Sequence, residues 1–542
     1  MLDKVAAEHT IQSRPPTPPP PAIPPFSFRL ATGMVGVLLA VLLAGFNEHV
    51  TEIGLTDISG QMHLSHDDAT WLTALFEAFN ISAMAFAPWC GATFSIRRVT
   101  MTATATAGFL GLVAPFMPDL GSMLVLRCVQ GLACGSLPPM LMTVALRYLP
   151  PNIKIYGLGA YALTSTFGPN MGLPLTGIMF EDFSWQFLFW EIVPLCALSI
   201  ACVAWGLPQD PLRLERFRQF DWRGLVTGLP GICMIVIALE QGDRLDWFRS
   251  PLITHLFFGG GFLFILFMIN EWTHPLPFFR ASLLKNRNVS ASLITLAGAL
   301  MLAAVTLDIP SEYLTEVRNY RPIQMVPMGL LLAVPQLVVL PLVAALCNIR
   351  AVDSRHVLIA ALAIQGFSYF LGTWIDADWV RENFYVILLL QVASQPMMVI
   401  ADLVIVTMGL GPADGPFISG LFNVTKGLAN AIAAGVVDAL MRRREQYHST
   451  MLLDHYGNQR FAMQGMGDPT AGELAPRIAD PAHVDGTAIG LFHKVVAEQS
   501  MILACADIYV VMIGVCAALI VLNSFLPTRV YPPRAPIAAP SR

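Results

Sequence analysis

The chain contains few charged residues for its length. Asp, Glu, Lys and Arg make up 13% of its 542 residues, whereas soluble domains average about 25%. Hydrophobic residues make up 55%, and the mean hydropathy is +0.60. The formal net charge of -5 gives no basic footprint of the kind that nucleic-acid binding requires. The composition therefore excludes a nucleic-acid-binding protein and predicts a chain that lies in a lipid bilayer.

The nine cysteines lack the spacing of a disulfide framework or of a metal site. All of them lie inside or at the edges of apolar stretches, and none lies in a long loop. The G-x-x-x-x-G-K-[ST] segment that would cradle a nucleotide is also missing. We therefore expect no metal site, no cofactor and no ATP-driven mechanism.

The first residues have the composition of a spacer. The stretch RPPTPPPPAIPPF, which begins at Arg14, favours polyproline conformations and cannot build a core. It lacks the basic, apolar and small-residue order of a signal peptide. We predict that residues 1–28 form a disordered, uncleaved, cytoplasmic N-terminus.

Long apolar runs are what the chain has in abundance. A helix needs roughly 20 apolar residues to cross a bilayer, and fourteen runs reach that length. They predict an all-α polytopic membrane protein with helices at 29–54, 69–92, 99–118, 121–149, 155–180, 186–207, 222–241, 251–271, 289–312, 323–347, 354–374, 383–408, 416–440 and 500–525.

The basic residues in the short connections predict the orientation. If the N-terminus lies inside, the inner connections hold most of the Lys and Arg residues, and the short outer connections hold few. We therefore expect a multi-pass protein of the bacterial inner (plasma) membrane with both termini in the cytoplasm. The long polar segment 442–498 then lies outside, and the tail 526–542 lies inside.

The fifth predicted helix carries the most specific motif. It reads GLGAYALTSTFGPNMGLPLTGIMF from Gly157. Its glycines let a neighbouring helix approach closely, and its prolines bend the axis. The GP-x-x-G core resembles the antiporter motif of the major facilitator superfamily. This resemblance implies a conformational motif that comprises Gly168, Pro169, Gly172, Pro174 and Gly177.

Other stretches extend the resemblance along the chain. LVLRCVQGLACG is similar to the superfamily's R-x-x-Q-G element, with Arg127 as its buried arginine. GATFSIRR resembles the superfamily's cytoplasmic gating loop without its acidic residue, and retains Gly91, Arg97 and Arg98. The stretches 220–251 and 422–448 resemble the inserted helices and the thirteenth helix of the 14-helix drug:proton antiporters, the EmrB/QacA group.

This resemblance implies both an architecture and a function. The architecture is a major facilitator fold with an N-terminal six-helix bundle at 29–207, a linker with two extra transmembrane helices at 208–288, and a C-terminal six-helix bundle at 289–525. The function is proton-coupled export of drugs or toxic amphipathic small molecules by alternating access. By similarity with tripartite EmrB-type systems, the outer segment would contact a periplasmic adaptor that leads to an outer-membrane channel.

The first apolar run carries an unusual group of ionisable residues near its outer end. Glu48, His49 and Glu52 lie on nearly one face of a helix, and Glu77 adds a carboxylate in the second run. Ionisable groups at membrane depth are costly and usually mark a pathway. Alignment to the family's first helix places Asn47 where an aspartate is common. The residues predicted for proton coupling are Glu48, His49, Glu52, Glu77 and Arg127.

The same residues also allow a structural interpretation. The charged group of the first run could lie solvated in the headgroup layer, or each member could be a hydrogen-bonded structural group. Asp402 and Lys426, on consecutive predicted helices, could form a structural ion pair, and Asp308 before Pro310 could mark a helix end. Buried Arg127 is expected to need a carboxylate partner.

Aromatic and polar residues of several runs are candidates for substrate contact. Such residues are also frequent in any helical bundle, so core packing is the alternative. The predicted set is Asn47, Trp71, Phe76, Phe79, Gln391, Gln395, Asn423 and Lys426.

Three other functions remain open from the sequence. The first is dedicated export of a specific metabolite or siderophore by the same fold. The second is a membrane enzyme built around Glu48-His49-x-x-Glu52, and the third is a receptor or scaffold without transport.

Overall fold

A computed structural model describes residues 26–150, 153–182, 185–278, 280–407, 415–458 and 484–526. Within these ranges the regular structure is entirely helical, without a β-strand, which confirms the predicted all-α class. The predicted proline-rich segment up to residue 25, the centre of the segment 442–498 and the tail from residue 527 lie outside the described residues.

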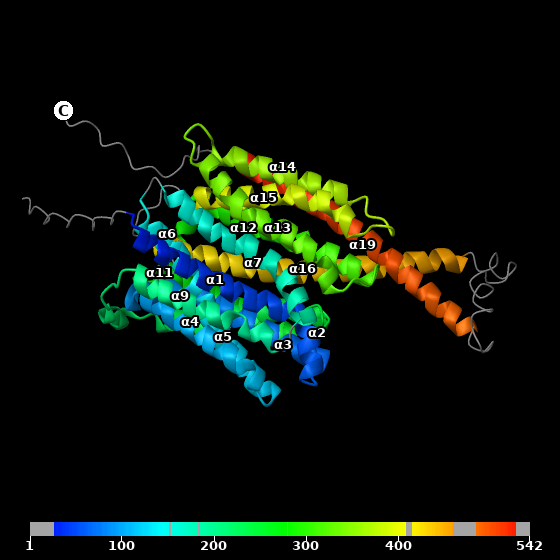
Figure 1. Cartoon of the computed structure of the whole chain (residues 1–542), viewed down its shortest axis with the longest axis horizontal. Helices are drawn as coiled ribbons and strands as arrows, with labels where there is room; N and C mark the ends of the chain where they lie inside the picture. Colours follow the sequence, from blue (N-terminus) through cyan, green and yellow to red (C-terminus); the bar gives the residue numbers. More distant parts are fainter. Residues whose placement is uncertain are drawn as a thin grey trace, which may run out of the picture.

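The long helices run roughly along one axis of the molecule (Figure 1). We call the end at which α1 begins and α19 finishes the N-terminal end, and the opposite end the far end. The helices are α1 (Phe28–Ile53), α2 (Leu55–Gln61), α3 (His66–Phe94), α4 (Ile96–Val113), α5 (Leu120–Gly135), α6 (Leu137–Tyr148), α7 (Lys154–Asp182), α8 (Phe187–Trp190), α9 (Ile192–Gly206), α10 (Trp222–Glu240), α11 (Pro251–Thr273), α12 (Arg287–Glu316), α13 (Pro322–Cys347), α14 (Ser354–Gly372), α15 (Arg381–Thr407), α16 (Gly415–Asn458) and α19 (Val484–Ser524).

Local sequence sets where these helices begin and end. Ser27 caps α1, and its Oγ accepts a hydrogen bond from the Leu30 amide at 3.3 Å. Asp119 caps α5 in the same way. The chain passes from α3 to α4 through Ser95 alone, whose φ of 85° reverses the backbone direction. The stretch predicted as a gating loop is therefore mostly helical.

The helices form two groups that meet along α7. In the first group α1 packs against α7 and α9, and α3 packs against α5. In the second group α12, α14, α15, α16 and α19 pack against one another, and α13 packs against α15. Contacts of α7 with α13 and α15, and of α16 with α3 and α6, join the groups. The interior between them is therefore built from helices of both halves of the sequence.

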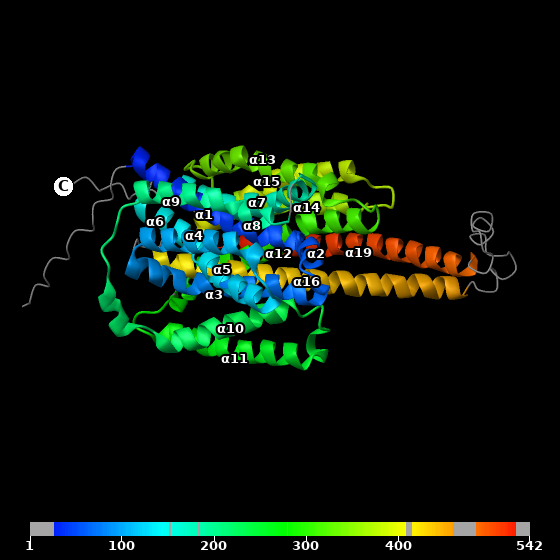
Figure 2. The same cartoon turned by 60° about the horizontal axis from the view of Figure 1, so that its bottom comes forward.

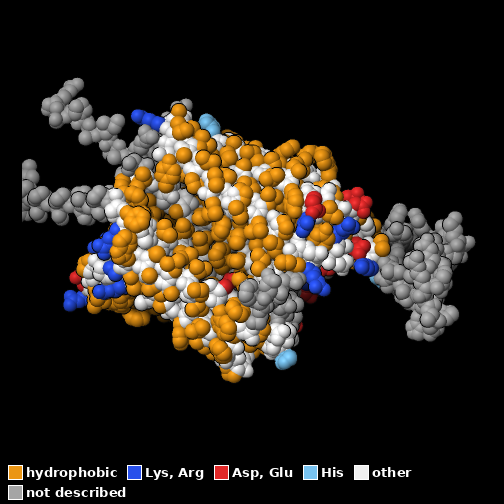
Figure 3. Space-filling model, viewed as in Figure 1, with side chains coloured by type: hydrophobic (Ala, Val, Ile, Leu, Met, Phe, Trp, Pro, Cys, Tyr) orange, Lys and Arg blue, Asp and Glu red, His pale blue; other side chains and the backbone are white. Residues whose placement is uncertain are grey.

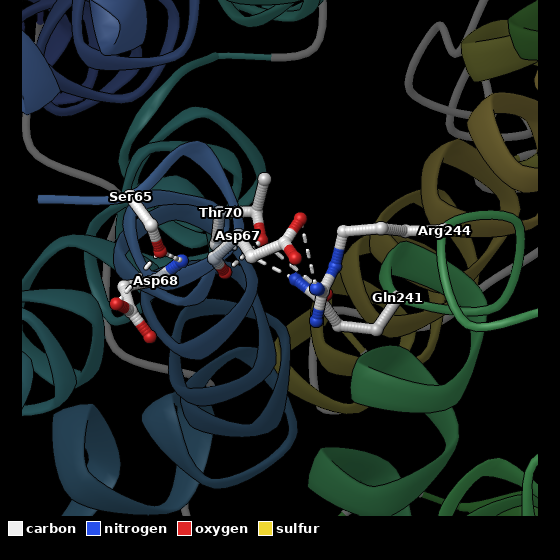
Figure 4. Close-up of polar contacts among 6 residues, drawn as sticks. All are labelled: Ser65, Asp67, Asp68, Thr70, Gln241 and Arg244. Carbon is white, nitrogen blue, oxygen red and sulfur yellow. Dashed lines mark hydrogen bonds and ion pairs between the residues drawn. The ribbon is translucent and has the colours of Figure 1, made fainter.

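The two helices α10 and α11 lie outside the main bundle (Figure 2). α10 packs against both α3 and α16, so it touches both groups. At the far end, Gln241 Nε2 donates to the Thr70 carbonyl at 3.1 Å, and Arg244 forms an ion pair with Asp67 at 3.2 Å (Figure 4). On the other side, Arg442 of α16 pairs with Asp243 at 3.2 Å.

The described residues contain eleven helical segments that are long and apolar enough to cross a membrane. The three remaining predicted spans are also helical, as α3, α7 and α14. Their mean hydropathy is lower than that of the eleven crossing candidates. In Figure 3 hydrophobic side chains cover the middle of the visible face, and most charged side chains lie toward the two ends. The predicted count of fourteen crossing helices is thus not confirmed.

Three helices are clearly longer than their predicted spans. α16 and α19 continue past residues 440 and 500 and project from the far end, so the segment 442–498 is helical at 442–458 and at 484–498 (Figures 1 and 2). α12 continues through Pro310 to Glu316, so Asp308 does not mark a helix end.

Candidate functional site

Arg127 of α5 is fully buried in the first group of helices. Its Nη1 donates to Asn47 Oδ1 and to Gln130 Oε1, each at 2.9 Å. Its Nε donates to the Leu72 carbonyl at 3.3 Å, and the guanidinium lies 4.1 Å from the ring centre of Phe76. The expectation that Arg127 pairs with a carboxylate is therefore wrong, because the Asn47 amide of α1 occupies that place. Neutral acceptors and an aromatic face take the place of a carboxylate at Nε and Nη1, whereas Nη2 has no hydrogen-bond partner among the described residues.

Small residues bring α5 close enough to α3 for these contacts. A Cβ on Gly131 would collide with the carbonyl oxygen of Phe76, and one on Gly135 would collide with that of Asn80. Only glycine fits such a close backbone approach. In the Q-G pair of the sequence motif, Gln130 therefore accepts a hydrogen bond from Arg127, and Gly131 lets α5 pack closely against α3.

Two carboxyl groups lie beside this arginine. Asn80 Nδ2 of α3 donates to Glu48 Oε2 of α1 at 3.1 Å. Glu77, one turn earlier on α3, lies close enough to interact electrostatically with the Glu48 carboxyl group. Both glutamates are half-buried, and both lie within Coulombic range of Arg127. The sequence prediction named the two glutamates and Arg127 but missed Asn80, although its spacing of three from Glu77 places both on one helix face.

His49 and Glu52 lie closer to the far end. His49 Nδ1 and Glu52 Oε2 are 3.3 Å apart, with 25% of the His49 side chain and 66% of the Glu52 side chain exposed. A Cβ added to Gly172 of α7 would lie 2.8 Å from His49 Cβ. The glycine motif of α7 therefore contacts the charged face of α1 directly at Gly172. A Cβ added to Gly168 would have no neighbour within 4 Å among the described residues.

The remaining motif residues face α13 of the second group. A Cβ on Gly177 would lie 3.2 Å from Ile323 Cα, and Gly329 of α13 lies against Pro174. Pro169 and Pro174 both lie inside the helix. The motif thus forms a close contact between α7 and helices of both groups.

The residues predicted for substrate contact divide between the interface and the core. Gln395 lines a small cavity of about 30 Å³ between α7, α12 and α15. Asn423 of α16 accepts a hydrogen bond from the Tyr161 hydroxyl at 2.8 Å, and Lys426 donates to Ser165 Oγ at 2.8 Å. These three residues therefore lie between the groups.

The other predicted contact residues have different surroundings. Gln391 Nε2 donates to Ser368 Oγ of α14 at 3.0 Å, inside the second group. Phe76 stacks on Arg127, Phe79 packs against the main core, and Trp71 is half-buried. The structure does not bring these four to the cavity that Gln395 lines.

Asp402 and Lys426 have separate partners. Ser292 Oγ donates to Asp402 Oδ1 at 2.6 Å, whereas Lys426 bonds Ser165 and lies within Coulombic range of Glu48 and Glu77. The predicted ion pair between them is therefore wrong, because the two residues face different neighbouring helices.

The family of the chain follows from comparison with known proteins. The Major Facilitator Superfamily profile matches residues 37–434, which is more than half of the chain. The chain belongs to the major facilitator superfamily. This confirms the resemblance drawn from the α5 and α7 motifs.

Curated relatives place the chain among efflux proteins of this superfamily. It is 23% identical over 480 residues to the fatty acid resistance protein FarB of Neisseria gonorrhoeae, covering 87% of this chain and 91% of FarB. It is 20% identical over 504 residues to the multidrug export protein EmrB of Escherichia coli (strain K12), covering 91% of this chain and 94% of EmrB. The predicted EmrB-like relationship is thereby confirmed, and the relatives are transporters rather than enzymes.

Solved structures agree on the fold. The human organic anion transporter MFSD10 aligns with a TM-score of 0.56 at 11% identity, covering 92% of this chain and 100% of that one. A bacterial homologue of the human lysosomal transporter Spinster aligns with a TM-score of 0.52 at 11% identity, covering 92% of this chain and 98% of that one. At this identity the likeness shows the major facilitator fold alone.

The residues left from the superfamily's gating loop lie at the N-terminal end. A Cβ on Gly91 would lie 2.7 Å from Met140 Sδ, so α3 and α6 approach closely there. Arg97 Nη1 donates to the Leu207 carbonyl at 3.5 Å, and Arg98 is exposed. Whether they act in gating stays a prediction.

The Arg127 contacts predict an unequal response to loss of a buried amide. Asn47→Leu leaves the buried guanidinium without one of its acceptors, which costs about 1–3 kcal/mol or more for a charged group. Asn523→Leu is the matched control, at an amide whose hydrogen bonds among the described residues go to the neutral Thr295 and Leu519. We expect a clearly larger drop in melting temperature in detergent for Asn47→Leu. Equal drops would contradict the role of Asn47 as the acceptor for a buried cation.

Proposed function

We propose that the protein is a proton-coupled exporter of drugs or toxic amphipathic small molecules that works by alternating access. The observation that carries the proposal is the pair of carboxyl groups of Glu48, which accepts a hydrogen bond from Asn80, and Glu77, placed beside buried Arg127. A structural ion pair would need one carboxylate for one cation. Two neighbouring carboxyl groups beside one cation exceed what charge balance needs, and the second can bind a proton.

The chemistry of the pair supports reversible proton binding. Two carboxylates in contact repel each other, so one proton shared between them is the favoured state. Arg127 opposes further protonation, because its charge favours the ionised form of a nearby carboxyl group. Exposed Glu52 and half-buried His49 lie between the far end and the pair, and in this proposal they pass protons to it.

The proposed membrane arrangement has fourteen crossing helices with both termini in the cytoplasm. α3, α7 and α14 have 29, 29 and 19 residues, which is enough to cross, and they run beside helices that are apolar enough to cross. The bias of basic residues toward the N-terminal end supports a cytoplasmic placement of that end. The bundles at 29–207 and 289–525 then rock against each other along α7 and α13, with the insert 208–288 at their edge.

A dedicated exporter of one metabolite or siderophore is the second candidate. It is favoured by Asn47, which stands where the family commonly has an aspartate and bonds Arg127. A changed charge at this place suggests a changed ligand. Broad dye efflux supports the multidrug function, and secretion of one compound class supports the dedicated exporter.

An efflux assay with matched variants tests the proton pair. In everted membrane vesicles, Glu48→Gln and Glu77→Gln are expected to lower pH-gradient-driven dye transport by about tenfold or more. Both should retain dye exchange without a gradient, because the substrate path is left intact. Glu382→Gln, which removes an exposed carboxylate of α15, is the control and should transport as the wild type does. Coupled transport that survives in both variants contradicts the assignment.

We further propose that the projecting parts of α16 and α19 contact a periplasmic adaptor. Together they extend beyond the other helices at the far end, where the proposed orientation places the periplasm (Figure 1). Full-length protein should co-purify with a candidate periplasmic adaptor, and a variant that lacks residues 450–490 should not. Undiminished co-purification of the shortened variant would rule this surface out.

A further inference from the structure

The linker between α9 and α10 lies at the N-terminal end of the molecule. Arg29 Nε of α1 donates to the Trp205 carbonyl of α9 at 2.7 Å, which places the end of α9 beside the start of α1. From there residues 207–221 run along this end to α10, and they include the short 3-10 helix η2 (Leu214–Gln219) (Figure 2). Both α9 and α10 are crossing candidates, so the linker meets the bilayer surface at each of its ends.

Contacts with α3 hold this linker in place. The Arg213 amide donates to the Thr93 carbonyl, near the end of α3, at 2.9 Å. The rings of Phe217 and Phe220 lie edge-on to Trp89 of α3, with ring centres 5.1 and 4.8 Å from it. The linker backbone therefore has a fixed position on the bundle, and its exposed side chains form a defined surface.

This surface combines apolar side chains with arginines. Its exposed apolar side chains belong to Leu212, Leu214, Phe217 and Trp222, and the last of these is 65% exposed. Its basic side chains are exposed or half-buried, and they belong to Arg213, Arg216, Arg218 and Arg223. We call these eight residues the linker surface. Exposed apolar groups among cations fit the boundary between hydrocarbon and headgroups, where tryptophan is also enriched.

The acidic residues of the linker leave most of this positive charge unbalanced. Asp210 forms an ion pair with Arg147 of α6 at 2.7 Å. Asp221 caps α10 and accepts a hydrogen bond from the Gly224 amide at 2.8 Å. Glu215 is the remaining acidic residue of the linker. One carboxylate therefore stands among four arginines.

The arginines of the linker surface also act on one another. None of the four forms an ion pair with another residue in the part of the chain that the structure describes. The pKa of Arg216 lies below its usual value, because partial burial and the charge of Arg213 both disfavour the cation, whereas Glu215 favours it. An anion bound between these side chains would offset their repulsion.

We propose that the linker surface binds an anionic phospholipid, with its arginines contacting the headgroup phosphate and its apolar side chains inserted among the acyl chains. A free anion would balance the charge but leave four apolar side chains in water, whereas a lipid provides for both. The site lies at the end of the bundle, away from the proposed proton pair, so this inference does not depend on the transported substrate.

Lipids with brominated acyl chains test the proposal on purified full-length protein in detergent micelles. Bromine quenches the fluorescence of nearby tryptophans, and exposed Trp222 belongs to the linker surface. The wild type should need about fivefold less phosphatidylglycerol than phosphatidylcholine for half-maximal quenching, because the arginines attract the anionic headgroup. In a variant that combines Arg213→Gln, Arg216→Gln and Arg218→Gln, this preference should fall to within about twofold.

A matched control removes three basic side chains elsewhere. Lys285→Gln, Arg287→Gln and Arg350→Gln change exposed residues of two other connections, and this variant should keep the preference for phosphatidylglycerol. Quenching by phosphatidylcholine should be the same in all three proteins, which shows that the fold is retained. If the glutamine variant of the linker does not fold, replacement of the same three arginines by lysine decides. The lysine variant should keep the preference at low salt and lose it at high salt.

Four results would overturn the proposal. The first is equal quenching of the wild type by the two lipids, and the second is an undiminished preference in the glutamine variant. The third is loss of the preference in the lysine variant at low salt. The fourth is a control that loses the preference as fully as the glutamine variant, since the effect would then belong to overall charge. Millimolar inorganic phosphate at constant ionic strength should not displace the lipid, and displacement would indicate a site for free anions instead.

Discussion

The hydrogen bonding of buried Arg127 fixes the arrangement of the first group of helices. A guanidinium without access to water needs acceptors, and here they come from Asn47 of α1, Leu72 of α3 and Gln130 of its own helix. These contacts set the rotation and depth of three helices at once. Because Glu48 follows Asn47 on α1, and Glu77 follows Phe76, whose ring lies against Arg127, on α3, the same register brings the two carboxyl groups together beside the cation. The proposed proton site is thus a geometric consequence of satisfying one arginine.

The amide at residue 47 also changes the electrostatics of this site. An aspartate there would have formed a buried ion pair with Arg127 and balanced its charge. Asn47 accepts the hydrogen bond but leaves the charge, and the carboxyl groups within Coulombic range are those of Glu48 and Glu77. The proposed proton-binding function is therefore displaced by one residue along α1 and shared with α3. A neutral group has replaced the family's acidic one and still accepts a hydrogen bond from the arginine.

Sequence patterns predicted the helices and the family, but not the side-chain partners. Hydropathy located every long helix, because crossing a bilayer requires long apolar runs, and the α7 motif indicated the superfamily. The predicted surroundings of a side chain were wrong where they depend on the rotation of helices that are distant in sequence. Gln391 faces α14, and Asp402 faces α12 rather than Lys426. Asn80 was missed because its spacing from Glu77 indicates a shared helix face but does not show that Glu48 of α1 lies opposite that face. The lengths of α16 and α19 were missed because polar helices that project from a bundle lack the hydropathy signal.

The central claim is that substrate export and inward proton movement are one process. Purified protein is reconstituted into liposomes that contain a pH-sensitive dye and a transported substrate, and the liposomes are diluted into substrate-free buffer without a pH gradient. The account predicts that the lumen acidifies as substrate leaves, because each outward step of the substrate is exchanged for protons moving inward. Substrate efflux through the protein with no change in luminal pH would contradict it.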